Sequence, residues 1–299
     1  MNDFLKKLLV YGFVFLLVSN LIAFASLYFL GKSSFYKSQF LENEVKEKTF
    51  DYIVLGSSTG LTTLNTNIID SVAGTKGINL SIDDTALNSH YLMLEHFYSL
   101  GKKTKYCILD VNYWNLQDAH PTLNDNDYRF VTHILKDYTY DYYNDLETNK
   151  VKVLAWSRYF PLLAIGYYNT ELFYPSLLTI VKPRKKNRFD NKGNYTYPSR
   201  GKKMKLIEKK EMQVSIQNPY FNRIVELCKK NNTYLILHQS PIIDKKVFLE
   251  DSNNYKYINH SILELSEDSY YDKIHVTQKG NSICSISLGN QLKLIYPTN

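Results

Sequence analysis

The feature that most constrains this chain is an uninterrupted apolar run near its amino terminus. Residues 8–30 carry no charged side chain, and a helix of that length can cross about 30 Å of hydrocarbon. The run is apolar all round, which disfavours an ordinary core helix. It is longer than a signal-peptide core, and no clear small-x-small cleavage site follows its end. We therefore predict a retained single-pass membrane anchor over residues 1–32, with a cleaved signal sequence as the alternative.

Lysines flank this run on both sides. Lys6 and Lys7 precede it, and Lys32 and Lys37 follow it. Because two lysines lie beside the amino terminus, we expect this end to stay cytoplasmic and the main domain to be periplasmic or extracellular. The polar segment that follows, residues 33–49, is expected to form a short stalk or a leading helix.

Short apolar runs and helix-like segments then alternate along the chain. This alternation predicts an α/β domain over residues 50–299, with a parallel sheet and helices on both faces. An inserted cap region over about 118–215 fits the alternation poorly. The expected strands are 50–55, 76–82, 105–111 and 233–237, and the expected helices are 60–72, 86–100, 219–230 and 278–295.

The inserted region holds an apolar segment and two basic stretches. Pro161 and Pro175 interrupt the apolar segment 159–181, which favours a membrane-facing or cap helix over a second membrane span. The basic stretches 182–188 and 200–205 are read as solvated loops. The alternative is contact with anionic lipid headgroups or an anionic polymer.

Two motifs far apart in the sequence carry the residue types of a serine-dependent site. A strand-like run ends at Gly56, Ser57 and Ser58, and a late loop holds Asp272 and His275 in an Asp-x-x-His pattern. A nucleophile, its base and the group that orients the base need to meet only in space. We therefore predict that Ser58, His275 and Asp272 form a catalytic triad.

These motifs resemble the blocks of the SGNH (GDSL-like) hydrolases and acyltransferases. The first block resembles Val54 to Ser58, and the last resembles Asp272-x-x-His275 with the trailing Thr277-x-x-Gly280. The resemblance implies a flavodoxin-like sheet, with Ser58 as nucleophile, His275 as base and Asp272 as its orienting partner. Ser57 replaces the usual Asp of the family, and Gly-Ser-Ser variants look like membrane-anchored members that acylate the cell envelope.

The resemblance also assigns residues to the oxyanion hole and the substrate pocket. Asn112 follows the third expected strand, where the family supplies an amide donor; Asn115 is the alternative. His238 ends the fourth expected strand and is expected to line the pocket.

The second block departs from the family pattern. Asn79 stands in an Asn-Leu-Ser sequence that resembles the family, but Asp83 and Asp84 replace the expected glycine. A backbone N–H near Asp83 can still serve the hole, whereas two carboxylates beside an oxyanion oppose catalysis.

The resemblance implies a serine-dependent O-acyl transferase or esterase that acts on a cell-envelope polysaccharide or similar glycan. A membrane-embedded partner is expected to supply the acyl group. The alternatives are a non-catalytic SGNH-like polysaccharide-binding or assembly protein, and D-alanyl transfer to teichoic acid.

No cofactor, metal or nucleic acid is expected. None of the three cysteines forms a Cys-x-x-Cys pair, no His/Glu spacing suggests a metal site, and no glycine-rich phosphate loop is present. The net charge of +7 is too mild to indicate nucleic-acid binding.

Overall fold

A computed structural model describes the chain apart from five short segments, and it divides into two compact units. The anchor unit comprises Met1–Val45 and Asp127–Asn187, and the sheet unit comprises Lys46–Asn126 and Arg188–Asn299. The described residues are 3–167, 170–199, 203–250 and 255–295, so the basic stretch 200–205 lies partly outside them.

A five-stranded parallel sheet forms the centre of the sheet unit, in the order β2-β1-β3-β5-β7. Its strands are rich in β-branched and aromatic residues, which suit a sheet buried on both faces. This confirms the expected α/β class. The strands are β1 (Thr49–Leu55), β2 (Gly77–Asn79), β3 (Lys103–Asp110), β5 (Tyr234–Gln239) and β7 (Lys256–Asn259).

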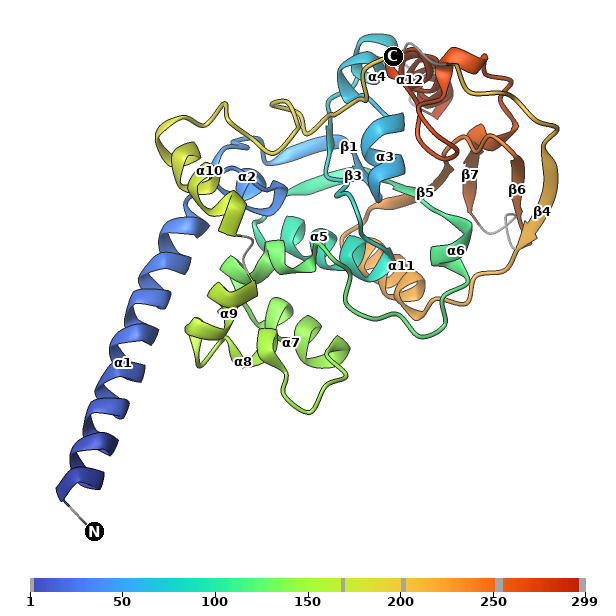
Figure 1. The fold of residues 1–299 in the computed structure, drawn as a ribbon. Coiled ribbons are helices and arrows are strands. Elements are labelled where there is room, and N and C mark those ends of the chain that lie inside the picture. The colour runs from blue at the N-terminus through green and yellow to red at the C-terminus, as the bar shows by residue number, and fades with distance from the viewer. Residues whose placement is uncertain (1–2, 168–169, 200–202, 251–254, 296–299) are drawn as a thin grey trace. The chain divides into compact units, whose positions relative to one another are not determined.

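Helices cover both faces of this sheet (Figure 1). On one face, Tyr52, Val54 and Ile108 point from the strands into a core with Ile69 and Leu288. Side chains two apart on a strand share a face, so this pattern follows from the strand period. That face carries α3 (Ser58–Thr63), α4 (Thr66–Ala73) and α12 (Gln278–Ile295), and the other carries α5 (Leu87–Ser99) and α11 (Pro219–Lys230).

Three features of the sheet unit differ from the sequence-based expectation. The helix expected over 60–72 is two helices, because Leu64 is extended and the Asn65 side chain caps α4 by accepting from the Asn67 N–H at 3.0 Å. Strand β7 was not expected, since only Ile258 of its four residues is buried. A second, parallel pair of strands, β4 (Lys210–Val214) and β6 (Lys245–Leu249), was also not expected. The short elements are α6 (Tyr113–Leu116), η3 (His260–Ile262) and η4 (Glu267–Ser269).

The anchor unit is helical in the part that the structure describes. Its first helix, α1, is long and apolar enough to cross a membrane, although a signal sequence has the same character. Helix α1 spans Asp3–Gly31. The other helices are α2 (Lys37–Asn43), η1 (Asp127–His133), α7 (Asp137–Leu146), α8 (Val153–Trp156), α9 (Pro161–Tyr167) and α10 (Thr170–Val181).

Helix α2 lies in the segment expected to be a short stalk or a leading helix, and it is packed in this unit. Phe40 and Leu41 of α2 are buried, and the buried Gln39 amide donates to the Thr132 hydroxyl at 2.9 Å. Because residues 127–187 group with residues 1–45, the region expected as a cap of the sheet domain forms one unit with α1 and α2.

Candidate active site

The turn after β1 presents Ser58 at the carboxyl end of the sheet. Strand β1 ends at Leu55, and α3 begins at Ser58. The glycines around this turn are needed for close packing, since a Cβ on Gly56 or Gly60 would lie 2.8 or 2.9 Å from the Asp110 Cβ. Asp110 ends β3, the neighbour of β1, so the turn sits where the strand order reverses in the sheet. Open α/β sheets bind their ligands at such a point.

Ser58, His275 and Asp272 lie in hydrogen-bonding sequence. The Ser58 Oγ is 2.8 Å from the His275 Nε2, and the His275 Nδ1 is 2.8 Å from the Asp272 Oδ2. A carboxylate that accepts from Nδ1–H leaves Nε2 as the acceptor for the serine hydroxyl. The three side chains thus have the order that proton transfer away from Ser58 requires.

Backbone amides fix the carboxylate of Asp272. Its Oδ1 accepts from the N–H groups of Ile274 and His275, each at 2.9 Å. Partial burial raises the pKa of Asp272, but the hydrogen bonds from His275 and the Ile274 amide outweigh it, so the net pKa lies below its usual value. The carboxylate therefore stays ionised and keeps its hold on the imidazole.

The loop that carries His275 is tied to the preceding turn. The Thr277 hydroxyl donates to the Asp268 carbonyl at 2.8 Å, and the Thr277 N–H donates to the Ser269 carbonyl at 2.9 Å. The Tyr271 N–H donates to the His275 carbonyl at 2.9 Å. The Thr277 hydroxyl thus fastens the loop to η4.

The Asn112 side chain lies beside the nucleophile turn. Its Nδ2 donates to the Ser57 Oγ at 2.8 Å, and its Oδ1 accepts from the Thr59 hydroxyl at 3.3 Å. Ser57 and Thr59 are the two neighbours of Ser58 in the chain. The amide is buried, and its orientation is fixed from both ends.

The second block supports the turn through its side chains. The Asn79 Nδ2 donates to the carbonyls of Gly60 at 3.2 Å and Leu64 at 2.9 Å, so this amide holds α3 and is not brought to Ser58. Asp84 has a positive φ of 52°, a backbone conformation that glycine adopts freely and that Asp also tolerates. The Asp83 carbonyl accepts from the Asn126 amide at 2.7 Å.

His238, expected to line the pocket, belongs to a buried polar chain. Its Nδ1 lies 2.6 Å from the Asp110 Oδ1, and its Nε2 lies 2.9 Å from the His260 Nδ1. The side chains of His238 and Asp110 have no exposed surface. They are register partners on β3 and β5. Each ends a strand expected at the same edge of one sheet, but their contact depends on the register between β3 and β5.

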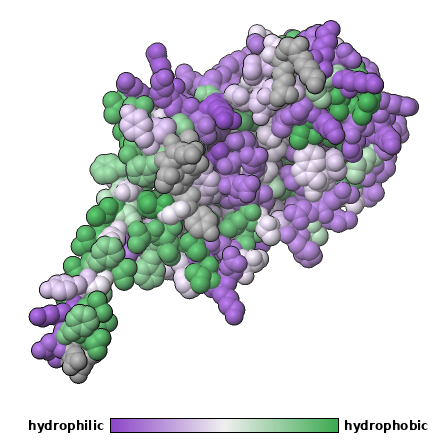
Figure 2. Space-filling view, in the orientation of Figure 1, coloured by the Kyte–Doolittle hydropathy of each residue, from purple (hydrophilic) through white to green (hydrophobic). Residues whose placement is uncertain are grey.

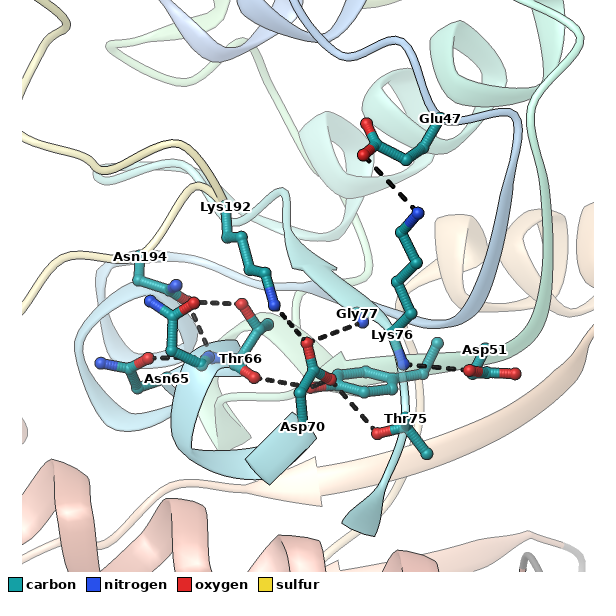
Figure 3. A network of polar contacts seen from close by, with 12 residues as sticks. Glu47, Asp51, Asn65, Thr66, Asp70, Thr75, Lys76, Gly77, Lys192 and Asn194 are labelled. Atoms are coloured by element: carbon teal, nitrogen blue, oxygen red, sulfur yellow. Dashed lines mark hydrogen bonds and ion pairs between the residues drawn. The ribbon is translucent and has the colours of Figure 1, made fainter. Parts of the chain in front are cut away.

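Residues 188–199, which we call the strap, reach the site without a motif in the sequence. The Lys192 Nζ contacts the Asp70 Oδ2 at 2.6 Å, and the Asn194 Oδ1 accepts from the Thr66 N–H at 2.8 Å. Figure 3 shows the side chains of Lys192 and Asn194 directed at α4. The strap is thereby fastened to the helix that follows the nucleophile turn.

Farther along the strap, Tyr197 packs against the loop that carries Asp272 and His275. Its ring stacks on Tyr271 with the centroids 4.0 Å apart, and it meets the His275 ring edge-on at 5.5 Å. An aromatic pair of this kind limits how the imidazole can tilt. Tyr197 was not predicted, since one tyrosine among many in a loop gives no local signal.

Comparison with models of known protein families finds no match, and comparison with curated proteins finds none either. An inference about function therefore depends on the site itself. The arrangement described above can activate a serine hydroxyl by transferring its proton to a histidine that a carboxylate orients.

Proposed function

We propose that this chain is a membrane-anchored, serine-dependent O-acyl transferase or esterase of the SGNH type. The observation that carries the proposal is the hydrogen-bonded chain from Ser58 through His275 to Asp272. It joins residues 217 positions apart, and these are the residues that the two sequence motifs predict to meet. A serine and a histidine that met by chance would not be expected to lie in the hydrogen-bonded order Ser58–His275–Asp272.

In the proposed mechanism, the Ser58 Oγ attacks the carbonyl carbon of an ester while the His275 Nε2 takes the hydroxyl proton. The resulting imidazolium is stabilised by the ionised Asp272. His275 then gives the proton to the leaving alcohol as the ester bond breaks. A sugar hydroxyl or water attacks the acyl-serine in turn, with His275 again as the base, and Ser58 is regenerated.

The charge that develops on the carbonyl oxygen needs donors near Ser58. We assign this role to the Ser58 backbone N–H and to Asn112, whose amide lies beside the turn and has a second Nδ2 hydrogen besides the one given to Ser57. One such donor is worth about 3 kcal/mol in the transition state. The backbone at Asp83 and Asp84 is a further candidate, since Asp84 adopts a glycine-like φ.

The substrate class is proposed from the fold and the anchor together. Numbered within the main sheet, the strand order is 2-1-3-4-5, the order of flavodoxin-like sheets. Lys6 and Lys7 favour a cytoplasmic amino terminus and a sheet unit outside the membrane. An acyl enzyme in that location meets cell-envelope glycans as acceptors, with a membrane-embedded partner as the proposed source of acyl groups.

A fluorophosphonate probe tests for the activated serine. The full chain in detergent should be labelled covalently, and labelling should be lost in Ser58→Ala and His275→Ala. The matched control is Ser282→Ala, which removes an exposed serine hydroxyl of α12 that bonds only its own helix turn through the Gln278 carbonyl. It should be labelled like the wild type.

Labelling that survives Ser58→Ala would refute the proposed nucleophile. A folded wild-type chain that takes no label would instead favour a glycan-binding protein. Transfer and hydrolysis are then separated by adding acetylated and free oligosaccharides and following the acetyl group by mass spectrometry.

A further inference from the structure

Within the anchor unit, helix α9 packs against α1 well inside the apolar run of α1. The Leu162 N–H, in α9, donates to the Asn20 Oδ1 at 3.3 Å. With the hydrocarbon beginning at Leu8, Asn20 lies about 18 Å along α1 at 1.5 Å per residue. A bilayer core is about 30 Å thick, so this contact falls roughly 12 Å inside the hydrocarbon on the side of the carboxyl end of α1.

The side chains around this contact suit a lipid environment. Trp156, Tyr159, Phe160 and Leu162 are exposed by 43, 65, 56 and 40%. Figure 2 shows apolar side chains gathered along α1 and over neighbouring helices of the anchor unit. Apolar patches of this kind mark an interaction surface, and Trp and Tyr are enriched where membranes meet water.

The segment from Trp156 to Leu162 contains one arginine, Arg158, and its positive charge is paired. The Arg158 guanidinium contacts the Asp137 carboxylate at 2.7 Å and lies 5.0 Å from the centre of the Tyr140 ring. A paired and stacked arginine with a long side chain can reach the headgroup layer from an apolar segment.

A second contact places basic residues at the level where α1 leaves the apolar run. The Ser34 N–H donates to the Thr179 hydroxyl at 3.0 Å, and the Asn187 N–H donates to the Phe35 carbonyl at 2.9 Å. Ser34 and Phe35 come four and five positions after the last apolar residue of the run. The exposed basic residues between Thr179 and Asn187 are Lys182, Arg184 and Lys185.

We propose that the anchor unit is itself seated in the membrane, in the leaflet next to the carboxyl end of α1. The segment from α8 to α9 lies in hydrocarbon, and the basic stretch 182–185 lies among anionic headgroups. Each lysine or arginine near such a surface adds electrostatic attraction to anionic lipid. The inference depends on α1 crossing a bilayer and is independent of the proposed chemistry.

The chain has two tryptophans, Trp114 and Trp156, which makes a depth measurement direct. The full chain is reconstituted in phosphatidylcholine and phosphatidylglycerol vesicles whose acyl chains carry bromine, a contact quencher of tryptophan emission. In Trp114→Phe, only Trp156 reports, and it should lose most of its emission to brominated lipid and little to aqueous iodide. In Trp156→Phe, Trp114 of the sheet unit gives the baseline.

Quenching of Trp156 by iodide, with none by brominated lipid, would overturn the proposal and leave the apolar face to a protein partner. If Trp114→Phe fails to fold, the difference between the wild type and Trp156→Phe measures the same quantity. That difference must still show quenching by brominated lipid for the proposal to stand.

Discussion

Asp110 has no exposed side-chain surface, yet both of its carboxylate oxygens are engaged. Oδ1 accepts from the Ser240 hydroxyl at 2.7 Å and contacts the His238 Nδ1 at 2.6 Å. Oδ2 accepts from the Thr59 hydroxyl at 2.5 Å, and Thr59 also contacts Asn112. Asp110 therefore positions the residue after the nucleophile and, through it, the proposed oxyanion donor.

We predict that Asp110→Asn lowers the free energy of unfolding by about 2–3 kcal/mol, since the amide NH2 cannot accept from the buried donors that one carboxylate oxygen now serves. The control Ser240→Ala removes one donor to the same carboxylate and should cost about 1 kcal/mol. Urea unfolding in detergent, followed by tryptophan fluorescence, measures both. Equal losses in the two variants would contradict the assignment of Asp110 as the acceptor that several buried donors share.

The proposed role of Asp272 is in the reaction rather than in the fold. We predict that Asp272→Asn lowers the rate of Ser58 labelling by about 10²–10⁴-fold, because an amide at this position favours the wrong imidazole tautomer. The control is Asp268→Asn on the same loop, whose carboxylate contacts Ser266 and Lys279. Labelling kinetics with the fluorophosphonate probe compare them, and a similar rate in both variants would argue against the proposed role of Asp272.

At the scale of elements, the start of α12 is packed too closely for any side chain at Gly280. A Cβ there would lie 2.8 Å from the Val276 Cβ and closer still to the Ser269 carbonyl. Since Val276 follows His275, a shift of this loop displaces the base. We predict that Gly280→Ala costs about 1–3 kcal/mol of stability and slows the labelling of Ser58.

The matched control is Gly166→Ala, at a helical glycine with nothing within 4 Å of its added Cβ. Replacing such a glycine leaves the fold unchanged or stabilises it by about 0.5–1 kcal/mol. Thermal unfolding and probe labelling of the two variants provide the comparison. If Gly280→Ala loses stability but keeps its labelling rate, the start of α12 does not position His275.

The elements that could be predicted from the sequence carry their own local signals. Helix α11 was expected over 219–230 and has those bounds, because Pro219 suits its first turn and Asn218 caps it by accepting from the Tyr220 N–H. Strand β7 and the β4–β6 pair lack such signals. Their burial comes from neighbours distant in sequence, which a local pattern cannot report.

The same distinction applies to the site. Ser58 and the Asp272–His275 loop stand in short motifs, and the structure brings them together. The positions of Tyr197 and of the Asp110–His238 pair depend on how the strap and two strands meet in space. Tertiary packing sets such hydrogen-bond partners, so the sequence could not show that His238 contacts Asp110 and His260. It was assigned to the pocket because it ends a strand.

At the scale of the whole molecule, buried histidines couple stability to pH. Burial lowers the pKa of His90 to about 4, with some opposition from Asp110, and burial beside His238 lowers the pKa of His260 well below 6.5. The unfolded chain therefore binds protons between about pH 6.5 and 4 that the folded chain does not. Stability should fall as pH falls through this window, by up to about 3 kcal/mol for His90.

Urea unfolding at pH 7 and at pH 4.5 measures this dependence. We predict a smaller loss on acidification in His90→Gln than in the wild type. His120→Gln, which changes an exposed histidine, should keep the wild-type dependence. An unchanged pH dependence in His90→Gln would show that His90 is not the group that resists protonation.

The separation of Ser58 from His275 in the chain has a consequence for biosynthesis. The nucleophile turn leaves the ribosome 217 residues before its base does, and the loop with His275 is held in place by the start of α12. While its amino-terminal part is being made, a nascent chain thus lacks the contact between Ser58 and His275. If this pair carries the proposed chemistry, that chemistry begins only after synthesis of the final helix, and incomplete products are inactive.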